Sequence, residues 1–172
     1  MILPTKKYID LFNKNLEFVQ SRVTNVSPKP KVLLINSGDG KTTIRGGRTK
    51  FVFELIEAAG GQTIQQIEGN ESGSPNFEEI LKFDPDVVIT DDLKHMQNWD
   101  WWAKLRAVKN NRVYVAPIDD PSVIMTGWVN NMYAPLGILW IAKSVHPELF
   151  KDLDLDKEHD KFCEEIFGIK TN

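Results

Sequence analysis

Apolar residues recur near the start of the chain at intervals of three and four, which is the period of an α-helix. Between Thr5 and Thr24 they are Tyr8, Phe12, Leu16, Val19 and Val23. Residues at this spacing share one face of a helix. Thr5 is a suitable N-cap, and the segment VSPKPK ends the helix because proline lacks an amide proton and restricts its predecessor to extended geometry. The pattern therefore predicts one amphipathic helix, followed by a connector.

Short, continuous apolar runs come next, and such runs are typical of strands buried on both faces of a parallel sheet. They read KVLLIN, DVVIT and RVYVAP, and TIQQIE is a weaker candidate. Helical periodicity separates them, over Val52–Ala59 and in SPNFEEILKF, where Ser74 is the expected cap and Pro75 the first helical residue. The alternation of strands and helices predicts an α/β domain with three layers, α/β/α, and a mainly parallel sheet.

The tryptophan-rich segment NWDWWAKLRAV predicts one or two helical turns beginning at Asp100. Its indoles either pack the helix over the sheet or face a ligand, and packing is the favoured interpretation. Beyond the last strand, residues 130–145 are apolar nearly all round, as in a helix packed into the body of a domain. A final helix is expected over 156–167, ending at Gly168, with Cys163 as an apolar residue in it.

The size and charge of the chain exclude several classes of protein. Its 172 residues with 41% hydrophobic content suit one compact domain with a substantial core. A net charge of -3, without a tract rich in lysine or arginine, argues against nucleic acid as a partner. A single cysteine excludes an internal disulfide and a cysteine metal cluster.

The segment VLLINSGDGKTT resembles a strand that leads into a phosphate-binding loop. Such a loop has the pattern Gly-x-x-x-x-Gly-Lys-Ser/Thr, in which backbone amides surround the phosphates and the lysine reaches the terminal ones. Gly40, Lys41 and Thr42 match its end, but the first glycine of the pattern falls on Ile35. A nucleotide-binding enzyme or switch that uses loop 38–45 is therefore retained only as an alternative.

The loops that follow the strands are the places to search for a ligand, because open α/β sheets bind ligands beyond the carboxyl ends of their strands. These loops read SGDGKTTIRGGRT, DDLKHMQNWDWW and IDDPSVIMTGWVNNMY. The first carries Lys41, Arg45 and Arg48, with glycines that let a ligand approach the backbone, and so suits an anion. The alternative is that Arg45 and Arg48 are solvated loop charges. The third carries Met125, Trp128 and Tyr133, whose flat or polarizable side chains suit an organic ligand.

The histidines give only weak indications of chemistry. His95 beside Asp91 and Asp92 is a weak candidate metal ligand, and a divalent-metal-binding domain is a further alternative. Without a second histidine at a defined spacing, however, a surface turn is favoured and no metal site is assigned. His146 is expected to have a structural role at a helix end, and His159 to lie on a solvated helix face. No Gly-x-Ser-x-Gly elbow, His-Glu-x-x-His or catalytic cysteine is present, so we expect a binding protein, not an enzyme, with no intrinsic cofactor.

Three motifs occur in order along the second half of the chain. They are LKFDPDVVI at Leu81–Ile89, NNRVY at Asn110–Tyr114, and PLGILWIAK at Pro135–Lys143 with HPE following at His146–Glu148. Together they resemble the C-terminal part of the substrate-binding proteins of ABC importers for iron-siderophore complexes, haem and cobalamin. The resemblance extends over nearly the whole chain.

This resemblance implies a protein with two α/β lobes joined by one long helix, with the ligand held between the lobes. Residues 1–27 would then be the end of the inter-lobe helix, and residues 28–172 the C-terminal substrate-binding lobe. The N-terminal lobe and the signal peptide would be absent from this chain. The full-length parent would act in the periplasm, or outside the membrane while tethered to it.

The resemblance also implies a function, namely capture of a chelated metal compound and its delivery to a membrane permease. A ferric siderophore or haem is the most expected ligand, and the parent's own N-terminal lobe and the ABC permease are the expected partners. In the family the second lobe contributes basic and aromatic side chains from the equivalent loops, which are here Arg45, Arg48, Trp128 and Tyr133.

Overall fold

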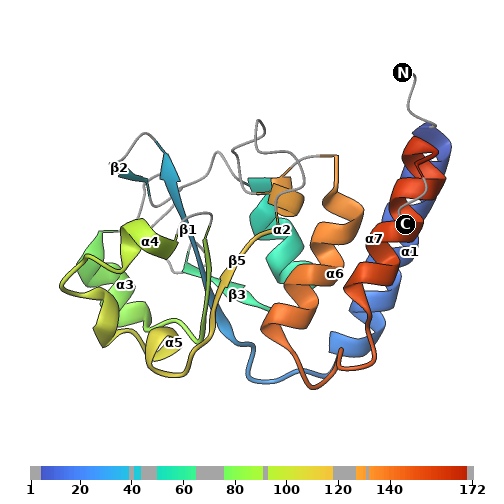
Figure 1. Ribbon diagram of the computed structural model, residues 1–172. Helices are drawn as coiled ribbons and strands as arrows, with labels where there is room; N and C mark the ends of the chain where they lie inside the picture. Colours follow the sequence, from blue (N-terminus) through green and yellow to red (C-terminus); the bar gives the residue numbers. More distant parts are fainter. Residues whose placement is uncertain are drawn as a thin grey trace.

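A computed structural model describes the fold of the chain (Figure 1). The described residues are 5–38, 41–43, 50–64, 76–90, 93–117, 127–130 and 132–169. Within these ranges, no helix is both long enough and apolar enough to cross a membrane.

Four parallel strands form the centre of the molecule, in the order β3-β1-β4-β5. Their bounds are Lys31–Gly38 for β1, Gln62–Thr63 for β3, Val87–Thr90 for β4 and Val113–Val115 for β5. A short fifth strand, β2 at Lys41–Thr43, pairs antiparallel with the end of β1. The predicted strands KVLLIN, DVVIT and RVYVAP are therefore confirmed; of TIQQIE, Thr63 lies in β3, and its last four residues lie outside the described ranges.

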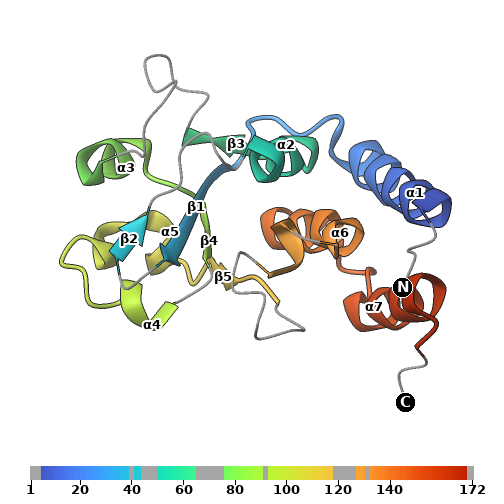
Figure 2. The same cartoon turned by 90° about the horizontal axis from the view of Figure 1, so that it is seen from above.

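Helices cover both faces of this sheet, as Figure 2 shows. On one side lie α3 (Phe77–Phe83), α4 (Leu93–Met96), the 3₁₀ turn η3 (Trp102–Lys104) and α5 (Arg106–Lys109). On the other lie α2 (Lys50–Ala58) and α6 (Ala134–Val145), with α1 (Thr5–Val23) and α7 (Leu155–Phe162) beyond them. The predicted α/β architecture with a parallel sheet between helices is confirmed.

Alternation along β1 divides the core into two parts, because successive side chains of a strand point to opposite faces. Val32 and Leu34 join the larger cluster, built with α1, α2, α6 and α7. Leu33 and Ile35 join the smaller one, which contains the buried Trp102 with Trp99 and Trp101 packed against it. The tryptophans therefore pack over the sheet, as the favoured interpretation predicted.

The predicted boundaries of two helices are wrong. The N-cap of α3 is Asn76, not Ser74: its side chain accepts the Glu79 amide while the Glu79 carboxylate accepts the Asn76 amide. This reciprocal capping box satisfies two otherwise unpaired amides, so the helix begins two residues later than predicted. The helix expected from 130 begins at Ala134, because residues Gly127–Asn130 form a separate 3₁₀ turn, η4.

The C-terminal helix follows the prediction closely. α7 is capped by Asp154, whose carboxylate accepts the Lys157 amide, and it continues into a π-helical turn, η5, at Cys163–Phe167. Gly168 ends it with φ of 69°, a left-handed conformation that suits glycine. Cys163 is buried, as an apolar residue would be.

Candidate functional site

The carboxyl ends of the three longer parallel strands lie along one edge of the sheet. Ile35 of β1 is in register with Thr90 of β4, and Thr90 is in register with Val115 of β5. The loops that follow these strands therefore start side by side. This edge is where open α/β sheets bind ligands.

The first loop starts as a β-hairpin and not as a phosphate-binding loop. Gly38 of β1 pairs with Lys41 of β2, which leaves Asp39 and Gly40 as the connection between the strands. A phosphate-binding loop needs its Lys-Thr pair at the start of a helix, where free backbone amides meet the phosphates. Lys41 and Thr42 lie in a strand instead, and α2 begins only at Lys50. The nucleotide alternative thus lacks the geometry it requires.

Three of the five predicted ligand-binding residues, Arg45, Arg48 and Met125, lie outside the described residues. Both arginines belong to the segment between β2 and α2, and Met125 belongs to the segment between β5 and η4. Their assignment to the loops at this edge follows from chain order alone, and their contact with a ligand stays a prediction.

Trp128 and Tyr133 are brought together by the fold. The Trp128 amide donates to the Pro117 carbonyl at 2.9 Å, which ties η4 to the segment after β5. The two rings stack with their centroids 6.5 Å apart and their planes at 14°. Aromatic side chains are therefore present at the carboxyl edge of the sheet, and their contact with a ligand stays a prediction.

Both rings are also engaged with α7. Trp128 is only 6% exposed and stacks on the His159 ring at 5.4 Å, with the planes at 8°. Tyr133 is partly buried and lies 5.2 Å from the Phe162 ring and 5.8 Å from the Phe167 ring. Most of each ring faces the core, so a ligand has only their remaining exposed edges to contact.

His159 is the aromatic partner that sequence reasoning missed. It was expected on a solvated helix face, but its side chain is 24% exposed and its ring stacks on both Trp128 and Tyr133. It also lies 3.6 Å, Nε2 to Sγ, from Cys163 one helical turn later. That spacing was the available signal, because residues i, i+3 and i+4 share a helix face.

The side chains of the candidate metal site lie outside the described part of the structure. Asp91 and Asp92 lie outside the described residues, and for His95 only the backbone, within α4, is described. Among the described side chains, no group of three His, Cys, Asp or Glu residues could hold a metal ion. His95 therefore stays a weak candidate.

Several motif residues that carry the family resemblance have structural roles. Arg112 donates from Nη2 to the carbonyls of Ser144 at 3.1 Å and Val145 at 2.8 Å, and so caps the end of α6. A Cβ on Gly137 would meet the Trp128 carbonyl oxygen at 2.5 Å, so only glycine lets α6 approach η4 this closely. These residues fix the backbone that presents the aromatic loop.

His146 has the structural role that its position predicted. It is 9% exposed, and a Cβ built on Gly60 would lie 3.0 Å from its Nε2. Burial lowers the pKa of His146 below its ordinary value, and the positive charge of Arg112 acts in the same direction. Burial thus favours the neutral form of this imidazole in the folded protein.

The chain is similar in sequence to known binding proteins. The family model described as periplasmic binding protein matches residues 5–119. The molybdate-binding protein MolA of Haemophilus influenzae is 23% identical in an alignment of 158 residues that covers 89% of this chain and 44% of MolA. The haem uptake protein IsdE of Staphylococcus aureus strain MRSA252 is 28% identical in an alignment of 118 residues that covers 59% of this chain and 40% of IsdE.

Solved structures share the fold. The TroA-like periplasmic binding protein FepB of Veillonella parvula superposes with a TM-score of 0.74 at 21% identity, covering 97% of this chain and 54% of that one. Ceue of Helicobacter pylori with Ni(II) bound gives 0.72 at 21% identity, covering 96% and 53%. The chain thus spans about half the length of the relatives that it matches.

Proposed function

Because the chain belongs to the periplasmic binding protein family, we propose that it is the ligand-binding part of an ABC importer's substrate-binding protein. The family is a non-enzymatic component of transport, so the expectation of a binder in place of an enzyme is confirmed. The observation that carries the proposal is the family match over residues 5–119, which contain the whole parallel sheet.

The ligand we propose is a chelated metal compound, with a ferric siderophore or haem as the leading candidates. Two features support this choice. The loop after β2 holds Arg45 and Arg48, which suit the negative charge of a ferric chelate or a haem propionate through charge-assisted hydrogen bonds. Trp128 and Tyr133 lie in the segment after β5, where aromatic rings suit an organic surface. Tyr133 is partly buried and Trp128 is 6% exposed, so we assign the larger contact to Tyr133. One relative, IsdE, is a haem uptake protein.

Molybdate is a second candidate, favoured by a separate observation. The relative MolA binds molybdate and aligns with 89% of this chain. A compact oxyanion would use the two arginines without needing the aromatic residues. The two candidates therefore differ in which loop they require.

We further propose that residues 1–27 are the end of a helix joining two lobes, and residues 28–172 the C-terminal lobe. The contacts of α1 suit such a rigid connection. Arg22 donates to both carboxylate oxygens of Asp152, at 2.6 and 2.8 Å, and to the Leu149 carbonyl. Asn15 is buried and donates to the Pro135 carbonyl at 2.8 Å. A lobe upstream would complete the ligand site, and the parent would act outside the cytoplasm together with a membrane permease.

Ligand titration of the parent protein, followed by tryptophan fluorescence, tests the proposal. The panel is a set of ferric siderophores, haem, cobalamin, nickel chelates and molybdate. We expect saturable binding of one class, weakened by Arg45→Gln or Arg48→Gln and unaffected by Lys109→Gln, an exposed residue of α5 with the same charge change. Binding of none of these compounds would refute the function.

Variants of Tyr133 and of the two arginines then distinguish the organic ligands, haem and siderophores, from molybdate. Tyr133→Ala should weaken binding of haem or a siderophore but not of molybdate, because only the organic ligands use the aromatic loop. The arginine variants should weaken binding of molybdate, of haem through its propionates, and of any siderophore whose ferric complex is anionic. Loss of molybdate binding in Tyr133→Ala, with thermal stability unchanged, would contradict this assignment of the loops.

A further inference from the structure

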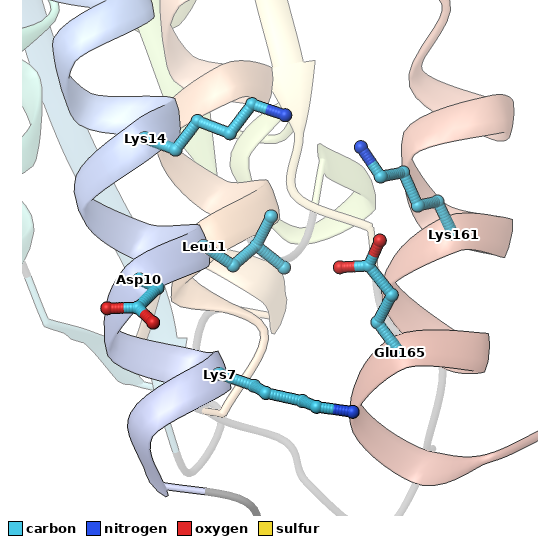
Figure 3. A pocket seen from close by; sticks show the side chains of 6 residues that line it. All are labelled: Lys7, Asp10, Leu11, Lys14, Lys161 and Glu165. Atoms are coloured by element: carbon cyan, nitrogen blue, oxygen red, sulfur yellow. The ribbon is translucent and has the colours of Figure 1, made fainter.

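A groove lies between α1 and the C-terminal helix, at the end of the molecule where these two elements stand together (Figure 3). Its volume is about 430 Å³. It is lined by Lys7, Asp10, Leu11 and Lys14 of α1, Lys161 of α7 and Glu165 of η5. None of these residues belongs to the loops that follow the parallel strands, so the groove is separate from the proposed ligand site and does not depend on that proposal.

Two ammonium groups face each other across this groove. Figure 3 shows the Lys14 side chain reaching from one wall and the Lys161 side chain from the other, each with its nitrogen directed toward the space between. Within the part of the chain that the structure describes, neither has a carboxylate partner within 4.0 Å. Asp10 and Glu165 also line the groove, but no ion pair joins either of them to Lys14 or Lys161 among the described residues. The two ammonium groups therefore repel each other, and an anion bound between them would be attracted to both.

The other lining residues define the chemistry further. Figure 3 shows Leu11 directed into the groove from α1, where it adds an apolar surface to the lining. The Glu165 carboxylate also points into the groove, from the same helix face as Lys161 one turn earlier. A carboxylate is an acceptor only, so it repels a fully ionised anion but accepts a hydrogen bond from an O–H group.

We propose that this groove binds a small oxyanion that also carries an O–H donor. The negatively charged oxygens would lie between Lys14 and Lys161, whose ammonium groups are donors that suit carboxylate or phosphate oxygens. The O–H group would donate to Glu165. Hydrogen phosphate and a hydroxy-polycarboxylate such as citrate share this chemistry.

The test compares anions that differ only in the O–H group. The purified chain is titrated at pH 8 with phosphate against sulfate, and with citrate against tricarballylate, at constant ionic strength set with chloride. Binding is followed by the backbone amide shifts of α1 and α7 in NMR spectra. We expect saturable shifts with phosphate, with citrate or with both, and weaker binding of the paired anion that lacks the O–H group.

Variants assign the roles of the side chains. Lys14→Gln and Lys161→Gln should each weaken binding about fivefold or more, the smallest effect expected for losing one charge at contact distance in water. Glu165→Gln should reduce the preference for phosphate over sulfate, because an amide no longer repels the fully ionised anion. Lys157→Gln, on the same helix but paired with Asp154 outside the groove, is the matched control.

Each outcome of these titrations tests either the site itself or the role given to Glu165. Shifts that do not saturate, or that the lysine variants leave unchanged, would overturn the site. Saturable binding that depends on both lysines, with equal affinity for phosphate and sulfate, would overturn the role given to Glu165. Binding of citrate alone would identify a polycarboxylate as the ligand class, and binding of phosphate alone would identify a phosphate group.

Discussion

Replacement of Trp128 by alanine tests whether this residue belongs mainly to the core or to the ligand site. The side chain is 6% exposed and its ring stacks on the rings of His159 and Tyr133. Truncation of a buried tryptophan costs about 3–5 kcal/mol, from lost apolar burial and from the cavity left behind. A domain of this size is stable by about 5–15 kcal/mol in total, so we expect Trp128→Ala to remove a large share of the stability.

Urea denaturation followed by far-UV circular dichroism measures this loss of stability. The far-UV signal reports the helices and strands, so the measurement does not depend on fluorescence from the five tryptophans, one of which the substitution removes. Trp128→Phe should cost less, because a smaller ring still stacks on His159. Met132→Ala is the control, since Met132 is 44% exposed and lies in the same segment. A loss of less than about 1 kcal/mol in Trp128→Ala, within the range of ordinary surface substitutions, would refute the packing argument.

Two further predictions concern α6 and its C-terminal end. Gly137→Ala should lower the midpoint of urea unfolding although alanine favours helices, because the new Cβ would lie 2.5 Å from the Trp128 carbonyl oxygen and force backbone apart; an unchanged or raised midpoint would contradict this. Burial lowers the pKa of His146 below 6.5, so its contribution is complete above pH 6.5 and is lost as pH falls toward the folded-state pKa. The free energy of unfolding, measured between pH 7 and pH 5, should therefore fall less steeply in His146→Gln than in the unsubstituted chain. The same pH dependence in both proteins would show that His146 does not contribute to it.

Local patterns were sufficient to predict most of the fold. The apolar runs KVLLIN and DVVIT became β1 and β4 because a strand buried on both faces needs an apolar residue at every position. Gly168 ended the last helix where predicted, since it supplies the left-handed conformation that other residues avoid. The start of α3 was missed by two residues, although the capping pair Asn76 and Glu79 was visible in the sequence.

The aromatic loop shows where prediction from sequence reached its limit. Trp128 and Tyr133 belong to one loop, but His159 comes from a helix more than 25 residues later. The spacing of His159 and Cys163 indicates that His159 lies on the buried face of its helix, but no local pattern says that this face meets Trp128 and Tyr133. The choice between a ligand-facing and a core-facing ring depends on which other elements cover it. Composition could not supply that information.

The sequence by itself determined the succession of strands and helices, the parallel sheet and the edge at which the loops after the strands gather, because these follow from periodicity, caps and chain order. Only the tertiary structure decided that Lys41 and Thr42 lie in a strand, that α7 covers the aromatic loop, and that Lys14 and Lys161 face each other. Each of these facts concerns residues whose positions depend on how distant segments pack. Such packing is fixed by the whole core, and not by the residues on either side.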